Sequence, residues 1–174
     1  MKINSIFGYS LLFVVLILLQ VLIFNHIRFG GYINPYIYIL FVMLLPIDVR
    51  GGTLLIMAFL TGLSIDMFLD SLGMHAAATL CMAFTRPAVI RLISVRSDFE
   101  PGTVPSISNQ GPRWIITYAV LLILAHHIPL FFLEIFRFNE FFSTFGRILL
   151  SSLFSFIFVI IGFFILDKSP GIKD

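Results

Sequence analysis

Apolar residues occur in six runs along the chain, and short polar stretches separate these runs. The runs cover residues 6–24, 33–47, 51–69, 73–93, 114–136 and 148–166. All but the second have about the 20 residues that a helix needs to cross the hydrocarbon core of a bilayer. The pattern therefore predicts an all-α integral membrane protein, a compact bundle of about six transmembrane helices that forms a single membrane domain over residues 1–174.

The second run, 33–47, is shorter than the others and is bounded by proline. Pro35 lies at its start and Pro46 at its end. At about 1.5 Å per residue, a helix of this length falls short of the bilayer thickness. We expect nearby tyrosines, Tyr36 and Tyr38 among them, to lie at the membrane interface and to help this helix span the bilayer.

The composition identifies lipid as the solvent for most of the chain. Hydrophobic residues make up 59% of it and charged residues 11%, whereas soluble domains have about 25% charged residues. The sparse Lys and Arg form no surface for phosphate contacts, so nucleic acid is not an expected partner. The single cysteine, Cys81, excludes an intramolecular disulfide. Because the chain has no Gly-rich phosphate loop, nucleophile elbow or HExxH motif, we expect neither an enzyme nor a bound cofactor or metal.

Lys and Arg lie unevenly on the two sides that six crossings would define. One side holds eight of the eleven, namely Lys2, Arg50, Arg86, Arg91, Arg96, Arg113, Lys168 and Lys173. The other side holds Arg28, Arg137 and Arg147. Because cytoplasmic flanks collect basic residues, we expect both termini and the polar loop 94–113 in the cytoplasm and the 70–73 turn outside. The prolines and glycines of that loop predict a flexible connection that cannot continue a helix.

The sharpest local feature is a pair of carboxylates at the outer end of the third run. Asp66 and Asp70 are spaced i and i+4, so they share one helix face with Gly62. An ionised Asp costs roughly 2.5 to 3.5 kcal/mol at the centre of a membrane helix, so Asp66 should face protein or water. One interpretation is a site for a cation, a proton or a partner's Arg, with His75 across the turn. The other is that Asp70 starts the turn while Asp66 bonds exposed backbone amides or a neighbouring helix.

Two adjacent histidines, His126 and His127, lie inside the fifth run, and Pro129 follows them. Neighbouring residues on a helix point about 100° apart, so the two rings cannot share a simple i, i+4 metal site. A proton relay is one hypothesis. The other is that one ring bonds a carbonyl freed by Pro129 or a group on another helix, while the second ring packs.

Small residues recur every few positions on two of the runs. They are Ala77, Cys81 and Thr85 on the fourth, and Ser151, Ser155 and Gly162 on the sixth. Such stripes let membrane helices approach closely, although small residues are also abundant in these helices by chance. They favour a compact bundle.

Two stretches carry a resemblance to a known family. They are 34–46, which reads N-P-Y-I-Y-I-L-F-V-M-L-L-P, and the pair Gly62-Leu63-Ser64-Ile65-Asp66 and Leu72-Gly73-Met74-His75-Ala76. Together with the short chain and the N-terminal anchor, they resemble the MreD family, the small membrane subunit of the bacterial rod-shape or elongation machinery. The loop 94–113 and the fifth run depart from the commonest members.

The resemblance implies a non-enzymatic subunit of the bacterial inner membrane. Its implied partners are the periplasmic scaffold MreC, the filament protein MreB, the glycosyltransferase RodA and a penicillin-binding transpeptidase. The implied fold is similar to the six-helix substrate-binding subunits of energy-coupling-factor vitamin transporters. Asp66, Leu72 and Gly73 correspond to motif positions of the family, and the resemblance gives none of them a catalytic role.

Two functions from different classes remain open. The first is a scaffold that supports peptidoglycan synthesis and cell shape through helix faces and short loops. In this case Arg86, Arg91 and Arg96 would meet anionic lipid or a cytoplasmic partner, and the 66–75 hairpin would meet a periplasmic one.

The alternative function is that of a substrate-binding subunit of a small-molecule, vitamin-like transporter. This function predicts a polar cavity near the middle of the bilayer. The expected lining residues are Asp66, His75, His126 and His127.

Overall fold

The protein, represented here by a computed structural model, is described over residues 6–26, 34–94, 99–135 and 141–167. These residues form helices and no strands, which confirms the all-α prediction. The long helices are α1 (Ile6–Leu22), α3 (Gly51–Leu69), α4 (Met74–Ile93), α6 (Pro112–Ile135) and α7 (Phe141–Leu166). The short ones are η1 (Phe24–His26), α2 (Leu40–Met43) and α5 (Ile107–Gln110).

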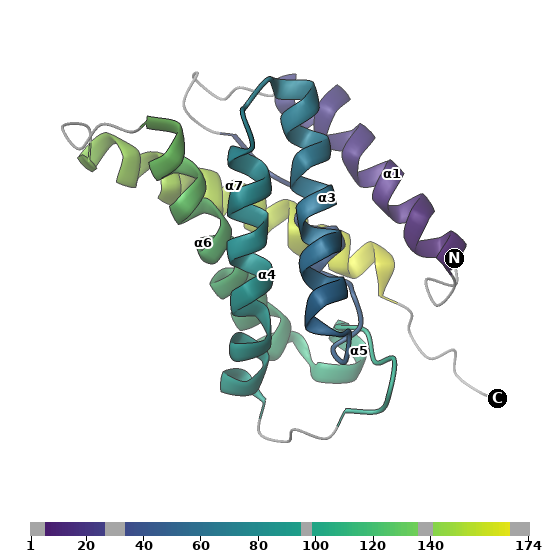
Figure 1. The fold of residues 1–174 in the computed structure, drawn as a ribbon. Helices are drawn as coiled ribbons and strands as arrows, with labels where there is room; N and C mark the ends of the chain where they lie inside the picture. The colour runs from purple at the N-terminus through teal and green to yellow at the C-terminus, as the bar shows by residue number, and fades with distance from the viewer. Residues whose placement is uncertain (1–5, 27–33, 95–98, 136–140, 168–174) are drawn as a thin grey trace.

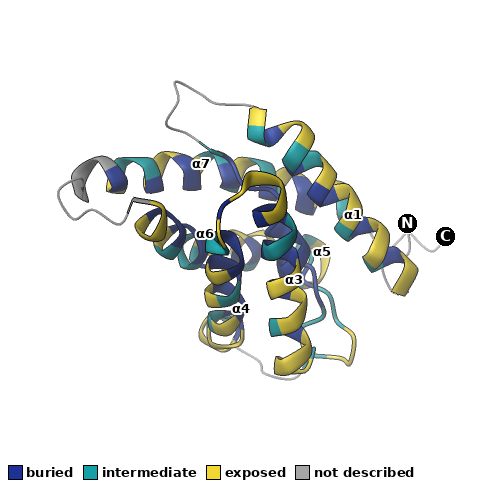
Figure 2. Ribbon diagram, turned by 45° about the horizontal axis from the view of Figure 1, so that its top comes forward, coloured by how far each residue is buried: buried dark blue, intermediate teal, exposed yellow. Residues whose placement is uncertain are grey.

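Within these residues, five helices are long and apolar enough to cross a membrane. Exposed positions occur along the outward faces of all five, as Figure 2 shows, and many of them are Leu, Ile or Phe. Apolar side chains on the outside of a bundle are stable only where lipid rather than water surrounds them. The chain is therefore a multi-pass membrane protein.

The third and fourth long runs form the expected antiparallel hairpin, in which α3 and α4 lie side by side (Figure 1). Gly62 sets their separation, because a Cβ at this position would lie 2.5 Å from both Cα of Ala76 and O of His75. Leu72, with a φ of 49°, and Gly73, with a φ of 87°, shape the connecting turn. We call the end of the bundle that holds this turn the hairpin end, and the opposite end, which holds residues 99–113, the loop end.

The prediction of a helix over 33–47 is wrong for the part that the structure describes. Residues 34–47, which we call the crossing segment, are irregular apart from the single turn of α2. A helix of this length would be too short, whereas extended backbone advances up to about 3.3 to 3.6 Å per residue. All residues from Tyr36 to Leu45 are buried, so the irregular backbone is shielded by protein, the condition under which it is tolerated at membrane depth.

The crossing segment contacts α3 and runs from the hairpin end to the loop end, opposite to the chain direction of that helix. Its first residues line a cavity together with Ser71 and His75 at the hairpin end. At the loop end, the N–H of its last residue, Ile47, donates to O of Thr103 at 2.8 Å. The expected flexible loop is thus ordered where it is described, since it docks on the crossing segment and contains α5.

Candidate functional site

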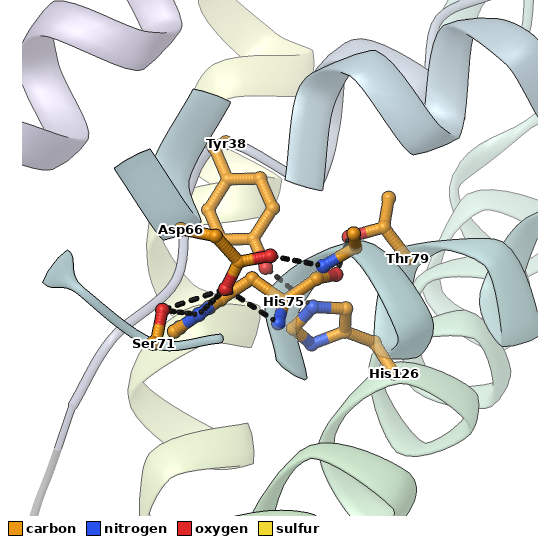
Figure 3. A network of polar contacts seen from close by, with 7 residues as sticks. Tyr38, Asp66, Ser71, His75, Thr79 and His126 are labelled. Carbon is orange, nitrogen blue, oxygen red and sulfur yellow. Dashed lines mark hydrogen bonds and ion pairs between the residues drawn. The ribbon is translucent and has the colours of Figure 1, made fainter. Parts of the chain in front are cut away.

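Asp66 is the centre of a buried polar cluster at the hairpin end (Figure 3). Asp66 is only 6% exposed. Oδ2 accepts from N of Ala76 at 2.9 Å, and Oδ1 accepts from N of His75 at 3.0 Å. Oδ1 also accepts from Oγ of Ser71 at 2.6 Å and from Nδ1 of His75 at 3.0 Å. One carboxylate therefore accepts four hydrogen bonds from the turn and the start of α4.

These bonds replace the N-cap that α4 lacks in its own sequence. The first N–H groups of a helix have no partner within the helix, and Gly73 at the N-cap position has no side chain to accept from them. Asp66 supplies the acceptor from the end of α3 and places a negative charge at the positive end of α4. Of the two interpretations, the structure therefore shows Asp66 bonding backbone amides, while the exposed Asp70 begins the turn.

His75 is 5% exposed and lies between Asp66 and two tyrosine rings. The ring centroid of Tyr36 is 5.5 Å away and that of Tyr38 is 6.1 Å away. Nδ1 contacts both Asp66 and Ser71, at 3.0 and 2.9 Å, whereas Nε2 is buried and has no hydrogen-bond partner. One ring nitrogen of His75 is thus fixed and the other is unsatisfied.

The two adjacent histidines of α6 are both hydrogen-bonded, to different parts of the bundle. Nε2 of His126 lies 2.6 Å from the hydroxyl of Tyr38, and Nε2 of His127 lies 3.0 Å from Oγ of Ser155 on α7. Nδ1 of His127 lies 2.9 Å from O of Ile123. The contact with another helix was expected. The expectation that the second ring only packs is wrong, and the carbonyl that His127 contacts is not the one four residues before Pro129.

The start of the crossing segment is held by Gln20 and Ser155, neither of which was expected in this role. Oε1 of Gln20 accepts from N of Ile37 at 2.8 Å, and Nε2 of Gln20 donates to O of Pro35 at 3.1 Å. Oγ of Ser155 accepts from N of Tyr36 at 2.8 Å. A signal for Gln20 was present, because it is the one amide within an otherwise apolar stretch of α1.

All three small residues of the sixth run contact the crossing segment. Oγ of Ser151 accepts from N of Asn34 at 3.1 Å, next to the bond from Ser155. At Gly162 an added Cβ would clash with the side chain of Leu40. This stripe therefore packs within the bundle, whereas Ala77 and Cys81 of the other stripe are exposed on α4.

Arg86 holds the opposite end of the crossing segment, which corrects the expectation that it meets lipid or a partner. It is 1% exposed. Its Nε donates to the hydroxyl of Tyr118 at 2.7 Å, and its terminal nitrogens donate to O of Pro46 at 3.2 Å and to O of Leu45. The Tyr118 hydroxyl in turn donates to O of Met43 at 3.0 Å. The cation therefore satisfies buried carbonyls instead of reaching the surface.

The other two arginines of the expected basic face have different positions. Arg91 is exposed near the end of α4, at the loop end. Arg96 lies outside the described residues. Only Arg91 thus remains, in the described part of the chain, as a surface cation of that group.

The polar cavity at the hairpin end has a volume of about 380 Å³. Of the four residues expected to line a transport cavity, only His75 lines it, because Asp66, His126 and His127 are used in hydrogen bonds inside the bundle. Within the described ranges, no three His, Cys, Asp or Glu side chains lie close enough to hold a metal ion.

The residues that this geometry brings together are those of the hairpin motif, with Gly62 at the helix contact, Asp66 and His75 in the buried cluster, and Leu72 and Gly73 in the turn. Arg86 is brought instead to the loop end. Comparison of the chain with family models, with curated proteins and with solved structures finds no match. The resemblance to the MreD family therefore rests on features of the sequence, chiefly the stretches 34–46, 62–66 and 72–76.

Proposed function

We propose that the chain is a non-enzymatic scaffold subunit of the bacterial cell-wall elongation complex. In this function it supports peptidoglycan synthesis and cell shape by binding membrane partners of the kinds that the MreD resemblance implies: an MreC-like periplasmic scaffold, a RodA-like glycosyltransferase, a penicillin-binding transpeptidase and an MreB-like filament. The protein acts through its surface, because the described helices leave little mass outside the bilayer.

The observation that carries this proposal is the exposed apex of the α3–α4 turn. Leu72 is 100% exposed and has a positive φ, a conformation that costs a leucine roughly 1 to 2 kcal/mol. Met67 and Phe68 are exposed beside it on the last turn of α3. An apolar side chain held outward at such a cost supports a role in contact with a partner.

The buried polar groups also favour a scaffold over the alternative of a vitamin-like transport subunit. Transport through the middle of the bundle would need polar groups that are free to contact a substrate. Asp66, His126 and His127 are instead bonded to neighbouring helices and to the backbone. Their role in holding the bundle together fits a protein whose function lies on its outside.

The proposal includes an orientation in the inner membrane with both termini in the cytoplasm. The crossing segment supports this orientation, because it returns the chain from the hairpin end to the loop end. Together with the five long helices it makes six crossings, an even number that leaves both termini on one side. Arg50, Arg91 and Arg113 then lie on the cytoplasmic side. Six crossings would also agree with the proposed likeness to substrate-binding subunits of energy-coupling-factor transporters.

The experiment that tests the function is purification of the tagged chain from bacterial membranes with identification of its partners by mass spectrometry. We expect enrichment of cell-wall elongation proteins. Asp66→Asn should insert normally but recover less of these partners and disturb cell shape, because an amide offers one acceptor where the carboxylate offers two. Glu100→Gln, at an exposed carboxylate of the loop end, is the matched control.

Two outcomes would contradict the proposal. One is recovery of transporter subunits, or tight copurification of a vitamin, in place of elongation proteins. The other is normal cell shape and full partner recovery in Asp66→Asn, provided that the variant reaches the membrane at the same level as Glu100→Gln.

A further inference from the structure

The cavity at the hairpin end has the size of a small-ligand site. Its volume of about 380 Å³ falls within the range of roughly 300 to 1,000 Å³ that is typical of such sites. Side chains from α1, α4, α6 and α7 line it together with the start of the crossing segment and the α3–α4 turn. Its charged and titratable lining residues are Tyr36, Asp70, His75, Glu134 and Arg147.

His75, one of the residues that line this cavity, has a ring nitrogen without a hydrogen-bond partner. The carboxylate of Asp66 can only accept, so Nδ1 of His75 carries the proton that joins them. In the tautomer whose single ring proton is on Nδ1, Nε2 presents a lone pair, and it has no partner although it is buried. A buried acceptor without a donor is unfavourable, so a ligand that brings an N–H or O–H group would be stabilised there.

The charges on the wall favour a cation as the source of this donor. Arg147 and Glu134 form an ion pair at 3.2 Å, so their charges cancel. Asp70, which is exposed at the rim of the cavity, adds a second carboxylate, so the Asp, Glu and Arg side chains that line the cavity have a net charge of one negative unit. Nε of Arg147 is buried without a partner and could also take an anionic oxygen of the same ligand.

We propose that this cavity binds a ligand with a primary ammonium group, which donates to Nε2 of His75 and pairs with Asp70. A primary ammonium has three N–H donors and one positive charge, and so it satisfies both groups at once. In a membrane this chemistry has two sources, the headgroup of an ethanolamine phospholipid and a free small amine. A choline headgroup has the same charge but no N–H, so it isolates the role of the donor.

The lipid arm of the test uses the full chain, purified in mild detergent, and native mass spectrometry during titration with ethanolamine or choline phospholipids of equal acyl chains. We expect the ethanolamine lipid to bind about tenfold more tightly. Asp70→Asn should remove most of this preference. Glu100→Gln, an exposed carboxylate at the loop end, should keep it.

The free-amine arm uses isothermal titration calorimetry of ethanolamine into the protein in choline-lipid nanodiscs. Saturable binding that is lost in Asp70→Asn supports the site with a free amine as its ligand, and binding in the lipid arm alone supports the site with a headgroup as its ligand. Equal binding of both lipids together with no ethanolamine binding would overturn the proposal. A preference for the ethanolamine lipid that survives in folded Asp70→Asn would also overturn it. If this variant fails to fold, the comparison of ethanolamine and choline lipids in the unmodified chain tests the proposal.

The inference goes beyond the scaffold function, and the two fail separately. A chain that binds no amine can still recover elongation partners. Loss of partner recovery in Asp66→Asn says nothing about the lipid preference of the unmodified chain.

Discussion

The α3–α4 hairpin and the crossing segment lie beside each other in the bundle, but their backbone groups are satisfied in different ways. In the hairpin, helical hydrogen bonds satisfy most of the backbone, and Asp66 accepts from two N–H groups at the start of α4 that have no partner within the helix. In the crossing segment, local backbone hydrogen bonds are confined to residues 37–45. Toward its two ends, the backbone is bonded instead by side chains of α1, α4 and α7, among them Gln20, Arg86 and Ser155.

Because of this difference, the two regions are sensitive to different kinds of substitution. The hairpin depends on close backbone contact, so added volume should harm it most. The crossing segment depends on a few polar side chains, so the loss of a donor or an acceptor should harm it most. Substitutions that remove a hydrogen bond from the crossing segment, or add volume to the hairpin, therefore test whether this difference holds.

The largest effect should come from Arg86→Ala. It removes the donor to the buried carbonyls of Leu45 and Pro46 and leaves the Tyr118 hydroxyl with one partner fewer. At about 1 to 3 kcal/mol for each buried group left unsatisfied, we expect a loss of about 3 kcal/mol or more in the free energy of unfolding. Chemical denaturation in detergent micelles measures this loss.

Arg91→Ala is the matched control for Arg86→Ala, because Arg91 is an exposed arginine of the same helix. It should change the free energy of unfolding by no more than about 0.5 kcal/mol. Equal losses in the two variants would show that Arg86 does not hold the crossing segment.

A somewhat smaller loss is expected for Gln20→Leu. Leucine nearly preserves the volume but leaves N of Ile37 without its acceptor and O of Pro35 without this donor. We expect a loss of about 2 to 3 kcal/mol by the same measurement. Ser64→Ala removes a hydroxyl that bonds only O of Leu60 in its own helix, and it should cost less than about 0.5 kcal/mol. A similar cost for both would mean that the amide is not needed for the crossing segment.

In the hairpin, Gly62→Leu tests volume instead of hydrogen bonding. Its Cβ alone would lie 2.5 Å from Cα of Ala76, so α3 and α4 must separate. We expect a loss of about 1 to 3 kcal/mol and lower expression. Leu63→Ala, at the half-buried neighbouring position, should be milder, and equal expression and partner recovery in the two variants would contradict the close contact.

The same contrast explains which parts of the fold could be predicted from the sequence. The run 51–69 has the bounds of α3, and 73–93 differs from α4 by one residue, because long apolar runs between turn residues have one stable solution in lipid. The run 148–166 lies within α7, which begins earlier, at Phe141. The run 33–47 has no such unique solution, since its apolar residues suit a buried extended segment as well as a helix.

The candidate site was also predicted only in part: the role of Asp66 was among those expected, but the position of Arg86 was not. Asp66 could be found because a carboxylate near the end of an apolar run needs a reason, and a capping role was among the expected ones. Arg86 was misplaced because the excess of basic residues at one end of the helices fixes an orientation but not the face on which a side chain lies. Its partners are carbonyls of an irregular segment, and the sequence does not show which segment is irregular.

The smallest effect on stability should come from Leu72→Asn, which separates the surface of the hairpin from its interior. Leu72 makes no buried contact and has a φ of 49°, a conformation that asparagine adopts more readily than leucine. The free energy of unfolding should therefore stay the same or rise by up to about 1 kcal/mol, measured by chemical denaturation in detergent. If the exposed turn is the partner contact, recovery of elongation partners from membranes should nevertheless fall. A stable variant with full partner recovery would place the contact elsewhere on the bundle, and a variant less stable by more than about 1 kcal/mol would show that the turn depends on this leucine for packing.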